Sequence, residues 1–345
     1  MPNVDKWSLL AGLRFVLASI VAVNHLGSHA TLGWLSFVPR LGAFEAVLGF
    51  LLISGYSVSV SCLKEPEGFL TRRLMRVYPI YLASIGLTLL VNVFLQHEKV
   101  PDLDVLLPNL LFLNQLFTTT SYVGPAWSLS LEFWLYCLAP VLLVAPPVWN
   151  RAIVYMSFAT FLCYTVSRAV FQLPYYSDVG FGANLCFLAF IWVCGLRLAS
   201  PDEDPGRVLR DIRWMFAGHL GLTAALQGAF RFKNHALDTF WREDLLTLAL
   251  QSLTLGVVYL IFSGRIMAPD SGGRRSGFLR FLGDISYPLY LIHIPVFVAL
   301  QHTPLHSAEL YFLAAVAVSA LLYRVVDVYS RRRHPGLKAV PVLPG

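Results

Sequence analysis

Arg14 and His25 are two residues whose types and spacing could do chemistry. They stand at the ends of RFVLASIVAVNH, an otherwise mostly apolar stretch. An α-helix turns by about 100° per residue, so a separation of 11 positions leaves the two side chains about 20° apart around the axis and about 16 Å apart along it. The spacing predicts one polar face, on which Arg14 holds an anion and His25 acts as a base farther along. The alternative is that Arg14 reaches to membrane headgroups and His25 caps the helix.

Three further stretches carry polar side chains that could act together. Arg73 and Arg76, in GFLTRRLMRVYPIYL, stand at i and i+3 and are neighbours on a helix, where they could cradle an anion or only anchor the membrane surface. Glu132, in PAWSLSLEFWLYCLAP, must pair with an arginine or accept several hydrogen bonds, and a structural and a catalytic role are both open. Tyr290 and His293, in LGDISYPLYLIHIPV, also stand at i and i+3, and His293 is either structural or catalytic.

The elements that must position these residues are membrane-spanning helices. Of the 345 residues, 57% are hydrophobic and only 13% are charged, well below the quarter or so usual for a soluble domain. Apolar runs of about 20 residues cross a bilayer as helices. Ten such runs occur: 8–26, 41–61, 78–96, 126–147, 152–171, 182–200, 214–231, 245–264, 281–301 and 308–328. The stretch 105–119 is shorter and more polar, and could be a surface or re-entrant segment. The predicted fold is an all-α bundle of about ten transmembrane helices.

The basic residues predict the orientation of this bundle, because short cytoplasmic loops collect lysine and arginine. With the N-terminus inside, 20 of the 26 basic residues fall on the inner side: Lys6, Arg14, Lys64, Arg72, Arg73, Arg76, Arg151, Arg197, Arg207, Arg210, Arg213, Arg265, Arg274, Arg275, Arg280, Arg324, Arg331, Arg332, Arg333 and Lys338. Both termini are then cytoplasmic, and residues 331–345 form a short basic tail behind a transmembrane domain of residues 1–330. Orientation in an anionic bilayer explains the net charge of +6, so no nucleic-acid partner is expected.

The cysteines and the internal symmetry of the chain narrow the function classes. The five cysteines form no CxxC pair and lie in or beside apolar runs, so neither a disulfide scaffold nor a metal site is expected. A transporter or flippase would also use buried charges, to line a passage. Many transporters show interrupted spans in two matching halves, and this sequence has none.

The motifs, taken in order, resemble those of the acyltransferase 3 family, multispan enzymes that move acyl groups, commonly acetyl, onto carbohydrates and other acceptors. The matching features are Arg14-x10-His25, FLLISGYSVSV followed by FLTRRLMRVYPIY, WSLSLEFWLY, and LGDISYPLYLIHIPV. The resemblance covers about residues 8–328. One departure is that many relatives carry two adjacent acidic residues in the third motif, whereas Glu132 is followed here by Phe133. A mechanism with two carboxylates at that position is therefore not expected.

The resemblance implies a role for each candidate residue. Acetyl-coenzyme A, or another acyl-coenzyme A, would be a donor substrate from the cytoplasm, and no cofactor would be permanently bound. The expected donor-binding residues are Arg14, Arg73, Arg76 and Tyr78, and the expected catalytic residues are His25, Arg14, Glu132 and His293. The expected acceptor-binding residues are Ser286, Tyr290 and Trp127. His25 would act as general base on the acceptor hydroxyl or, by a second route, would carry the acyl group itself.

The expected acceptor is a hydroxyl of a cell-surface or exported carbohydrate, such as an exopolysaccharide or a lipopolysaccharide O-antigen. The enzyme would then be a multi-pass protein of the bacterial cytoplasmic membrane. Alternatives within the same class are a macrolide or lipid acceptor and the succinylation of a glucan.

Overall fold

The fold is a bundle of helices. The computed structural model describes residues 4–265, 274–304 and 306–327, and within these ranges it contains no strand. The α-helices are α1 (Val4–Leu26), α2 (Ala43–Lys64), α3 (Phe69–Phe94), α4 (Leu103–Leu110), α5 (Trp127–Val144), α6 (Pro147–Phe171), α7 (Ala183–Leu198), α8 (Pro205–Lys233), α9 (Leu237–Thr239), α10 (Leu245–Phe262), α11 (Arg274–Gln301) and α12 (Ala308–Leu322). Short helical turns join several of them: η1 (Gly33–Phe37), η2 (Pro39–Leu41), η3 (Gly124–Ala126), η4 (Tyr176–Asp178), η5 (Phe240–Asp244) and η6 (Tyr323–Asp327).

Each of the ten predicted spans coincides with one of these helices, which confirms the all-α membrane bundle. In the described part of the chain, eight helices are long and apolar enough to cross a membrane. The other two predicted spans are α7, which is apolar but only 16 residues long, and α8, whose 29 residues include many charged side chains. The cytoplasmic location of both termini stays a prediction, and the expected basic tail 331–345 lies outside the described residues.

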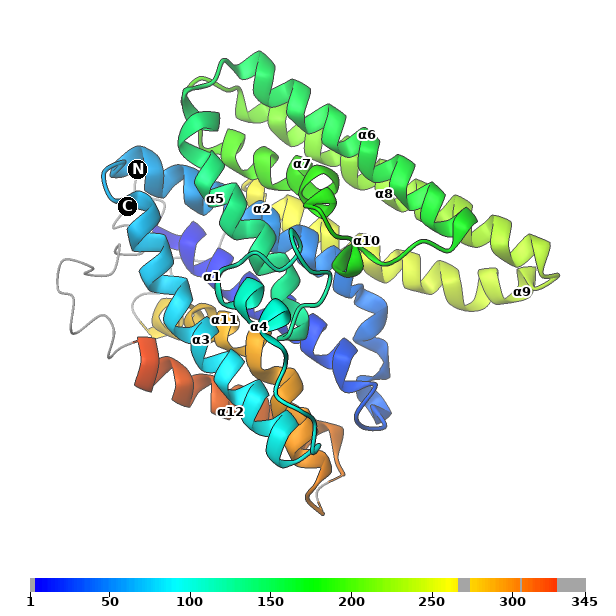
Figure 1. Cartoon of the computed structure of the whole chain (residues 1–345). Helices are drawn as coiled ribbons and strands as arrows, with labels where there is room; N and C mark the ends of the chain where they lie inside the picture. Colours follow the sequence, from blue (N-terminus) through cyan, green and yellow to red (C-terminus); the bar gives the residue numbers. More distant parts are fainter. Residues whose placement is uncertain (1–3, 266–273, 305, 328–345) are drawn as a thin grey trace.

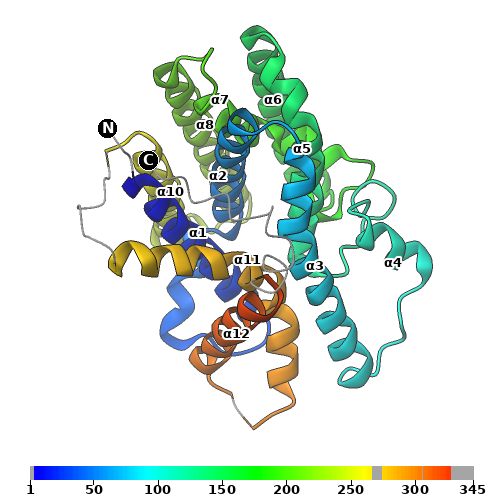
Figure 2. The same cartoon turned by 90° about the vertical axis from the view of Figure 1, so that its left-hand side faces the viewer.

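Helix α1 lies at the centre of one half of the bundle, against α2 and α11, and α11 also contacts α3 and α12 (Figures 1 and 2). Small residues allow the closest approach, as is common between membrane helices. A Cβ added to Gly283 of α11 would lie 2.5 Å from the Cβ of Ala11 on α1, which is too close for any side chain. This contact holds in register the two helices that carry Arg14, His25 and His293.

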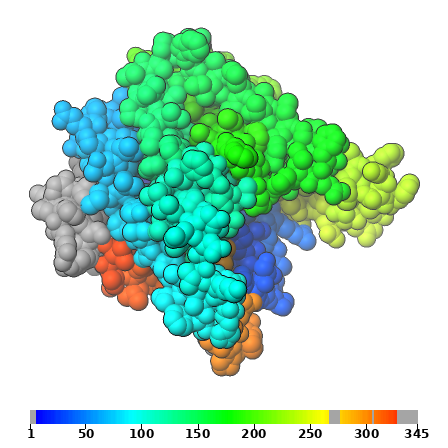
Figure 3. All heavy atoms as spheres, in the orientation of Figure 1, coloured from blue at the N-terminus to red at the C-terminus, as the bar shows by residue number. Residues whose placement is uncertain are grey.

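The other half of the bundle is built on α2 and α7. A Cβ on Gly55 of α2 would lie 1.9 Å from the carbonyl oxygen of Trp192, and one on Gly195 of α7 would lie 2.2 Å from that of Leu52, so the two backbones touch. Helices α6 and α8 pack outside α7, and the end of the molecule formed by α8, α9 and α10 projects beyond the rest (Figures 1 and 3).

A buried group of charges joins α6, α7 and α8. Arg197 of α7 is fully buried and donates from Nε and Nη2 to the two carboxylate oxygens of Glu203, at 2.8 and 3.1 Å. Its Nη1 donates to Asp211 of α8 at 3.2 Å, and the hydroxyl of Tyr155 on α6 donates to the other oxygen of Asp211 at 2.9 Å. Because a buried charge without a partner is costly, this group keeps the three helices together at one end.

The stretch 105–119 does not form a spanning helix. It comprises most of α4 and a loop that folds against α3 and α5. Two side chains of α5, Ser130 and Trp134, donate to the carbonyl oxygen of Phe112 at 2.7 and 3.0 Å. The hydroxyl of Tyr81 on α3 donates to the carbonyl oxygen of Asn109 at 2.8 Å. These bonds satisfy backbone oxygens inside the bundle, as irregular chain within a membrane requires.

Candidate active site

Arg14 and His25 lie on one helix, α1, and each meets residues brought by other helices. Arg14 lines two adjoining cavities and forms no hydrogen bond or ion pair with another described residue. His25 sits one residue before the end of α1 and forms a hydrogen bond with His293 of α11. The polar face predicted from the spacing thus has an open guanidinium at one level and a paired imidazole at the other.

The two histidines form a directed chain of hydrogen bonds. Nδ1 of His293 lies 2.9 Å from the carbonyl oxygen of Leu289, which can only accept, so this nitrogen carries the hydrogen. In a neutral ring Nε2 is then an acceptor, and it receives a hydrogen bond from Nδ1 of His25 at 2.8 Å. The Nε2 of His25 keeps its lone pair. His293 is fully buried and uses both ring nitrogens, whereas His25 is half-buried and has one nitrogen left for a substrate.

Two adjoining cavities, which together we call the arginine cavity, open around Arg14. The deeper part measures about 920 Å³ and the outer part about 930 Å³. Both parts are lined by Arg14, Arg73, Arg76, Gly283 and Asp284. The outer part adds Arg72 and Arg280, and the deeper part adds Glu132. Five arginines and two carboxylates therefore surround this space, and its net charge attracts anions.

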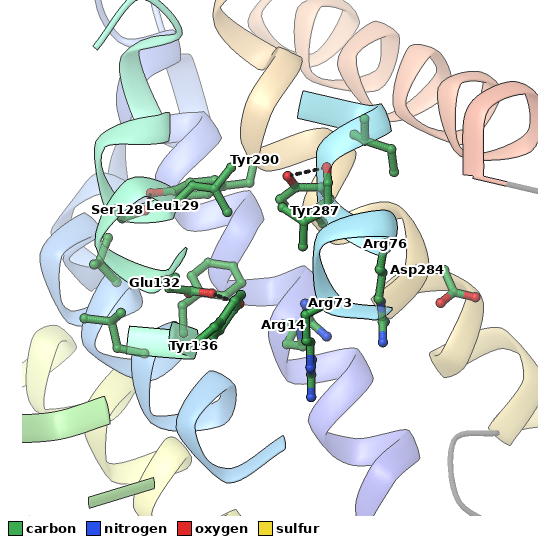
Figure 4. Close-up of a pocket in the computed structure, with 16 residues that line it drawn as sticks. Arg14, Arg73, Arg76, Ser128, Leu129, Glu132, Tyr136, Asp284, Tyr287 and Tyr290 are labelled. Atoms are coloured by element: carbon green, nitrogen blue, oxygen red, sulfur yellow. Dashed lines mark hydrogen bonds between the residues drawn. The ribbon is translucent and has the colours of Figure 1, made fainter. Parts of the chain in front are cut away.

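The predicted pair Arg73 and Arg76 lies on the wall of this cavity (Figure 4). Arg73 donates from Nη2 to the carbonyl oxygen of Ser57 at 2.7 Å, and its guanidinium lies over the rings of Phe69 and Tyr136, at 5.8 and 5.9 Å from their centres. Arg76 is exposed at the mouth of the cavity. Arg73 is held in place on the wall, and Arg76 lies at the mouth where a ligand would enter.

Glu132 is kept in the bundle by hydrogen bonds. It accepts from the hydroxyl of Ser54 at 3.0 Å and from that of Tyr136, one helical turn along α5. No ion pair among the described residues involves Glu132, although Arg14 and Arg73 lie across the cavity from it (Figure 4). Of the two expected ways to stabilise this carboxylate, the structure has the hydrogen bonds.

Tyr290 lines the deep end of the arginine cavity. Its hydroxyl lies 2.8 Å from that of Ser128, and its ring packs edge-on against Phe50, with ring centres 5.4 Å apart. Beside it, the hydroxyl of Tyr287 donates to the carbonyl oxygen of Val77 at 3.0 Å (Figure 4). Tyr290 thus lies between the arginines and the histidine pair.

A third cavity, here called the histidine cavity, opens on the other side of this layer and measures about 910 Å³. Its lining residues are His25, Thr119, Thr120, Ser121, Gly124, Pro125, Trp127, Tyr175, Ser177, Asp178 and Ile294. Ser128 lines the arginine cavity and its neighbour Trp127 lines the histidine cavity. Likewise Tyr290 and Ile294, one turn apart on α11, line one cavity each, so the two cavities adjoin neighbouring turns of the same helix.

Besides His293, two of the predicted site residues do not line these cavities. Ser286 is fully buried and donates to the carbonyl oxygen of Gly283 in its own helix at 2.6 Å. Tyr78 donates to the carbonyl oxygen of Leu110 at 3.0 Å and so holds the loop after α4. Both side chains are occupied in supporting the fold.

Several residues of the cavities were not predicted from the sequence. Tyr136 and Tyr287 lie in the quoted motifs, and Tyr136 is four residues after Glu132, a spacing that could have identified it. Asp178 and Arg280 had no local signal. No group of three or more His, Cys, Asp or Glu side chains suited to a metal ion occurs among the described residues, and the five cysteines are free thiols.

Comparison with known proteins identifies the family. The profile of the acyltransferase 3 family, described as an acyltransferase domain, matches residues 9–324. A protein of Acidianus two-tailed virus named "Putative acetyltransferase ORF330" is 26% identical over 301 residues, which cover 83% of this chain and 82% of the relative. No solved structure matches the chain. The chain belongs to the acyltransferase 3 family and is an integral membrane acyltransferase.

Proposed function

We propose that the enzyme transfers an acetyl group from acetyl-coenzyme A to a hydroxyl of a cell-surface or exported carbohydrate. The observation that carries this proposal is the position of His25, whose Nε2 is unbonded and which lines the histidine cavity one layer away from the arginine cavity. A base between a cationic cavity and a second, polar cavity suits a reaction between a polyanionic donor and a hydroxylic acceptor.

The arginine cavity is the proposed donor site. Coenzyme A carries phosphates at one end and its thioester at the end of a long arm. Arg76 at the mouth and Arg73 on the wall would bind phosphate oxygens, for which guanidinium groups are well suited. Arg14 lies deeper on α1 and would hold the arm, with the thioester directed towards Tyr290 and the histidine pair.

The transfer step needs a single base. Nε2 of His25 takes the proton of the acceptor hydroxyl while its oxygen attacks the carbonyl carbon of the thioester. The carbon–sulfur bond then breaks and the new ester forms. Coenzyme A leaves as a thiolate, and the proton stays on His25. The second route, in which His25 carries the acetyl group, uses the same nitrogen as nucleophile. Both routes require His293 to hold the hydrogen of His25 on Nδ1.

The proposed orientation places the arginine cavity at the cytoplasmic side, where acetyl-coenzyme A is made, and the histidine cavity at the outer side. This follows the distribution of the basic residues, most of which lie on the inner side of the predicted topology. In a bacterial cell the membrane would be the cytoplasmic membrane, and the acceptor would meet the enzyme on its outer face.

The test compares His25→Ala and Arg14→Ala with His302→Ala, an exposed histidine near the end of α11 that lines none of the three cavities. Membranes containing each variant at equal amounts are given acetyl-coenzyme A, and free thiol is measured together with the O-acetyl signal of the surface glycans by NMR. We expect His25→Ala to lose about 100-fold or more of both, since a positioned base contributes at least that much. His302→Ala should match the wild type. Full activity of both His25→Ala and Arg14→Ala would refute the proposed mechanism.

A further inference from the structure

We propose that the histidine cavity is a binding site for one sugar residue of the acceptor, with the carboxylate of Asp178 binding its hydroxyl groups. This inference rests on the proposed function and adds to it the place and the chemical class of the acceptor.

The histidine cavity is formed by two loops that come together over the end of α1. One loop brings Thr119, Thr120 and Ser121, and the other brings Tyr175 and Asp178. The loops lie more than 50 residues apart in the sequence, and both reach the cavity that His25 lines. A hydroxyl bound between them is in the cavity that contains the proposed base.

The two loops are held together by a buried amide. Gln115 is 2% exposed and donates from Nε2 to the carbonyl oxygen of Ser177 at 3.0 Å. Its own Oε1 accepts from the side chain of Asn184, which is fully buried, at 2.6 Å, and its carbonyl oxygen accepts from the backbone of Gly182 at 2.8 Å. A buried amide that is bonded at both Nε2 and Oε1 fixes the distance between the loops, so the cavity exists before the ligand arrives.

The lining of the histidine cavity fits a sugar better than an apolar acceptor. Hydroxyl groups line one side, and the rings of Trp127 and Tyr175 supply aromatic surface. Pro125 and Ile294 are the aliphatic members, whereas the arginine cavity includes Val47, Leu51, Val77 and Ile80. Hydroxyl and carboxylate groups can bond to several hydroxyls of one sugar, and aromatic rings, apolar in body, cover its carbon–hydrogen face.

Asp178 is the residue of this cavity that can accept the most hydrogen bonds from hydroxyl groups. Its side chain is exposed and forms no hydrogen bond with another described residue. An ionised carboxylate accepts from two or more donors, and bonds to a charged group are stronger than those between neutral groups. The hydrocarbon chain of a lipid offers this carboxylate no hydrogen-bond donor, and a specific site avoids leaving a polar group unpaired.

The test uses two variants of the cavity and one matched control. Asp178→Ala removes the carboxylate, and Thr119→Trp fills the cavity from an exposed position. Asp104→Ala removes an exposed carboxylate on α4, which does not line the cavity. Each variant replaces the natural gene in its own host, and the O-acetyl content of the surface glycans is measured by NMR. Binding of acetyl-coenzyme A to the purified protein is measured by thermal shift.

We expect Asp178→Ala and Thr119→Trp to lower the O-acetyl content about tenfold or more, because a lost hydrogen bond to a charged group weakens binding by that order. Both should bind acetyl-coenzyme A as the wild type does, and Asp104→Ala should be unchanged. Wild-type acetylation by both cavity variants would overturn the inference. An acetyl group that appears on a lipid fraction only when the gene is present would refute the sugar as acceptor but not the acyl transfer. If the wild-type gene changes no acetyl signal, the proposed function itself fails.

Discussion

At the scale of single residues, the proposed reaction depends on which ring nitrogen of His25 carries no hydrogen. The carbonyl oxygen of Leu289 fixes the hydrogen of His293, and His293 in turn fixes that of His25. His293 itself is fully buried and lines none of the three cavities, so it acts through His25. It is a positioning residue in the proposed mechanism.

Replacing His293 should therefore lower turnover without weakening donor binding. We expect His293→Leu, which keeps the volume but offers no acceptor, to reduce kcat about 10- to 100-fold, the usual loss when a residue that orients a functional group is removed. KM for acetyl-coenzyme A should stay near the wild-type value. His293→Gln can place an oxygen near the position of Nε2 and should recover part of the loss.

The measurement is steady-state thiol release with purified protein at equal folded fraction, checked by thermal unfolding in detergent. A structural role alone would lower stability and would treat the two variants alike. Equal kcat values for His293→Leu and the wild type would refute the positioning role.

The residue scale also shows what one sequence can predict. Helical periodicity placed Arg14 and His25 on one face, because both belong to one rigid helix. It could not pair His25 with His293, which lies 268 positions away, since a spacing says nothing about which helix faces which. Ser286 shared a helix with Tyr290 and His293, but its hydroxyl bonds to its own backbone. A serine in a helix always has that local alternative.

At the scale of elements, α5 and α11 together form the layer between the two cavities. Ser128 at the start of α5 meets Tyr290 of α11, and the hydroxyl groups lie 2.8 Å apart. In the proposed reaction the acyl group ends beside this layer, because His25 lies directly beyond it. The ring of Tyr290 then limits how long an acyl group the deep end can hold.

Replacing the ring of Tyr290 by a smaller side chain should change the donor that the enzyme prefers. We expect Tyr290→Leu to raise the ratio of kcat/KM for butyryl- over acetyl-coenzyme A about tenfold, since two buried methylenes contribute about 1.6 kcal/mol. Tyr287→Phe is a control beside it in the same cavity. It removes the hydroxyl that bonds to the carbonyl oxygen of Val77 but keeps the volume of the ring, so it should leave the ratio unchanged. The ratio is measured by thiol release with each donor. An unchanged ratio in Tyr290→Leu would place the acyl group elsewhere.

The sequence predicted the elements better than their packing. All ten apolar runs became helices, because a run of that length has no other way to satisfy its backbone in a membrane. The ends moved where local chemistry decided them: α8 begins at Pro205, nine residues before the predicted span, with Asp204 accepting from the backbone of Gly206. The loops of the histidine cavity had no periodicity, and contacts with side chains such as Gln115, Asn109 and Tyr164 define them.

At the scale of the whole molecule, the arginine cavity and the histidine cavity differ in charge: five arginines surround the first, whereas Asp178 lines the second. The turn between α2 and α3 lies at the end of the bundle that carries Arg72 and Arg73, and the C-terminal ends of α1 and α8 lie away from it (Figure 1). A donor that cannot cross a membrane must meet the arginine end from the side on which it is made. The activity therefore depends on the orientation of the whole chain.

This orientation can be tested with a single cysteine at each end. Glu67→Cys lies in the turn before α3, and Lys233→Cys lies at the end of α8; both positions are exposed. In intact cells we expect a maleimide that does not cross membranes to label Lys233→Cys, and to label Glu67→Cys only after the cells are permeabilised. The five native cysteines lie in the helices, and the unmodified protein shows their background labelling. The reverse pattern would place the arginine cavity outside, where acetyl-coenzyme A is not supplied, and the proposed reaction would then need a different donor.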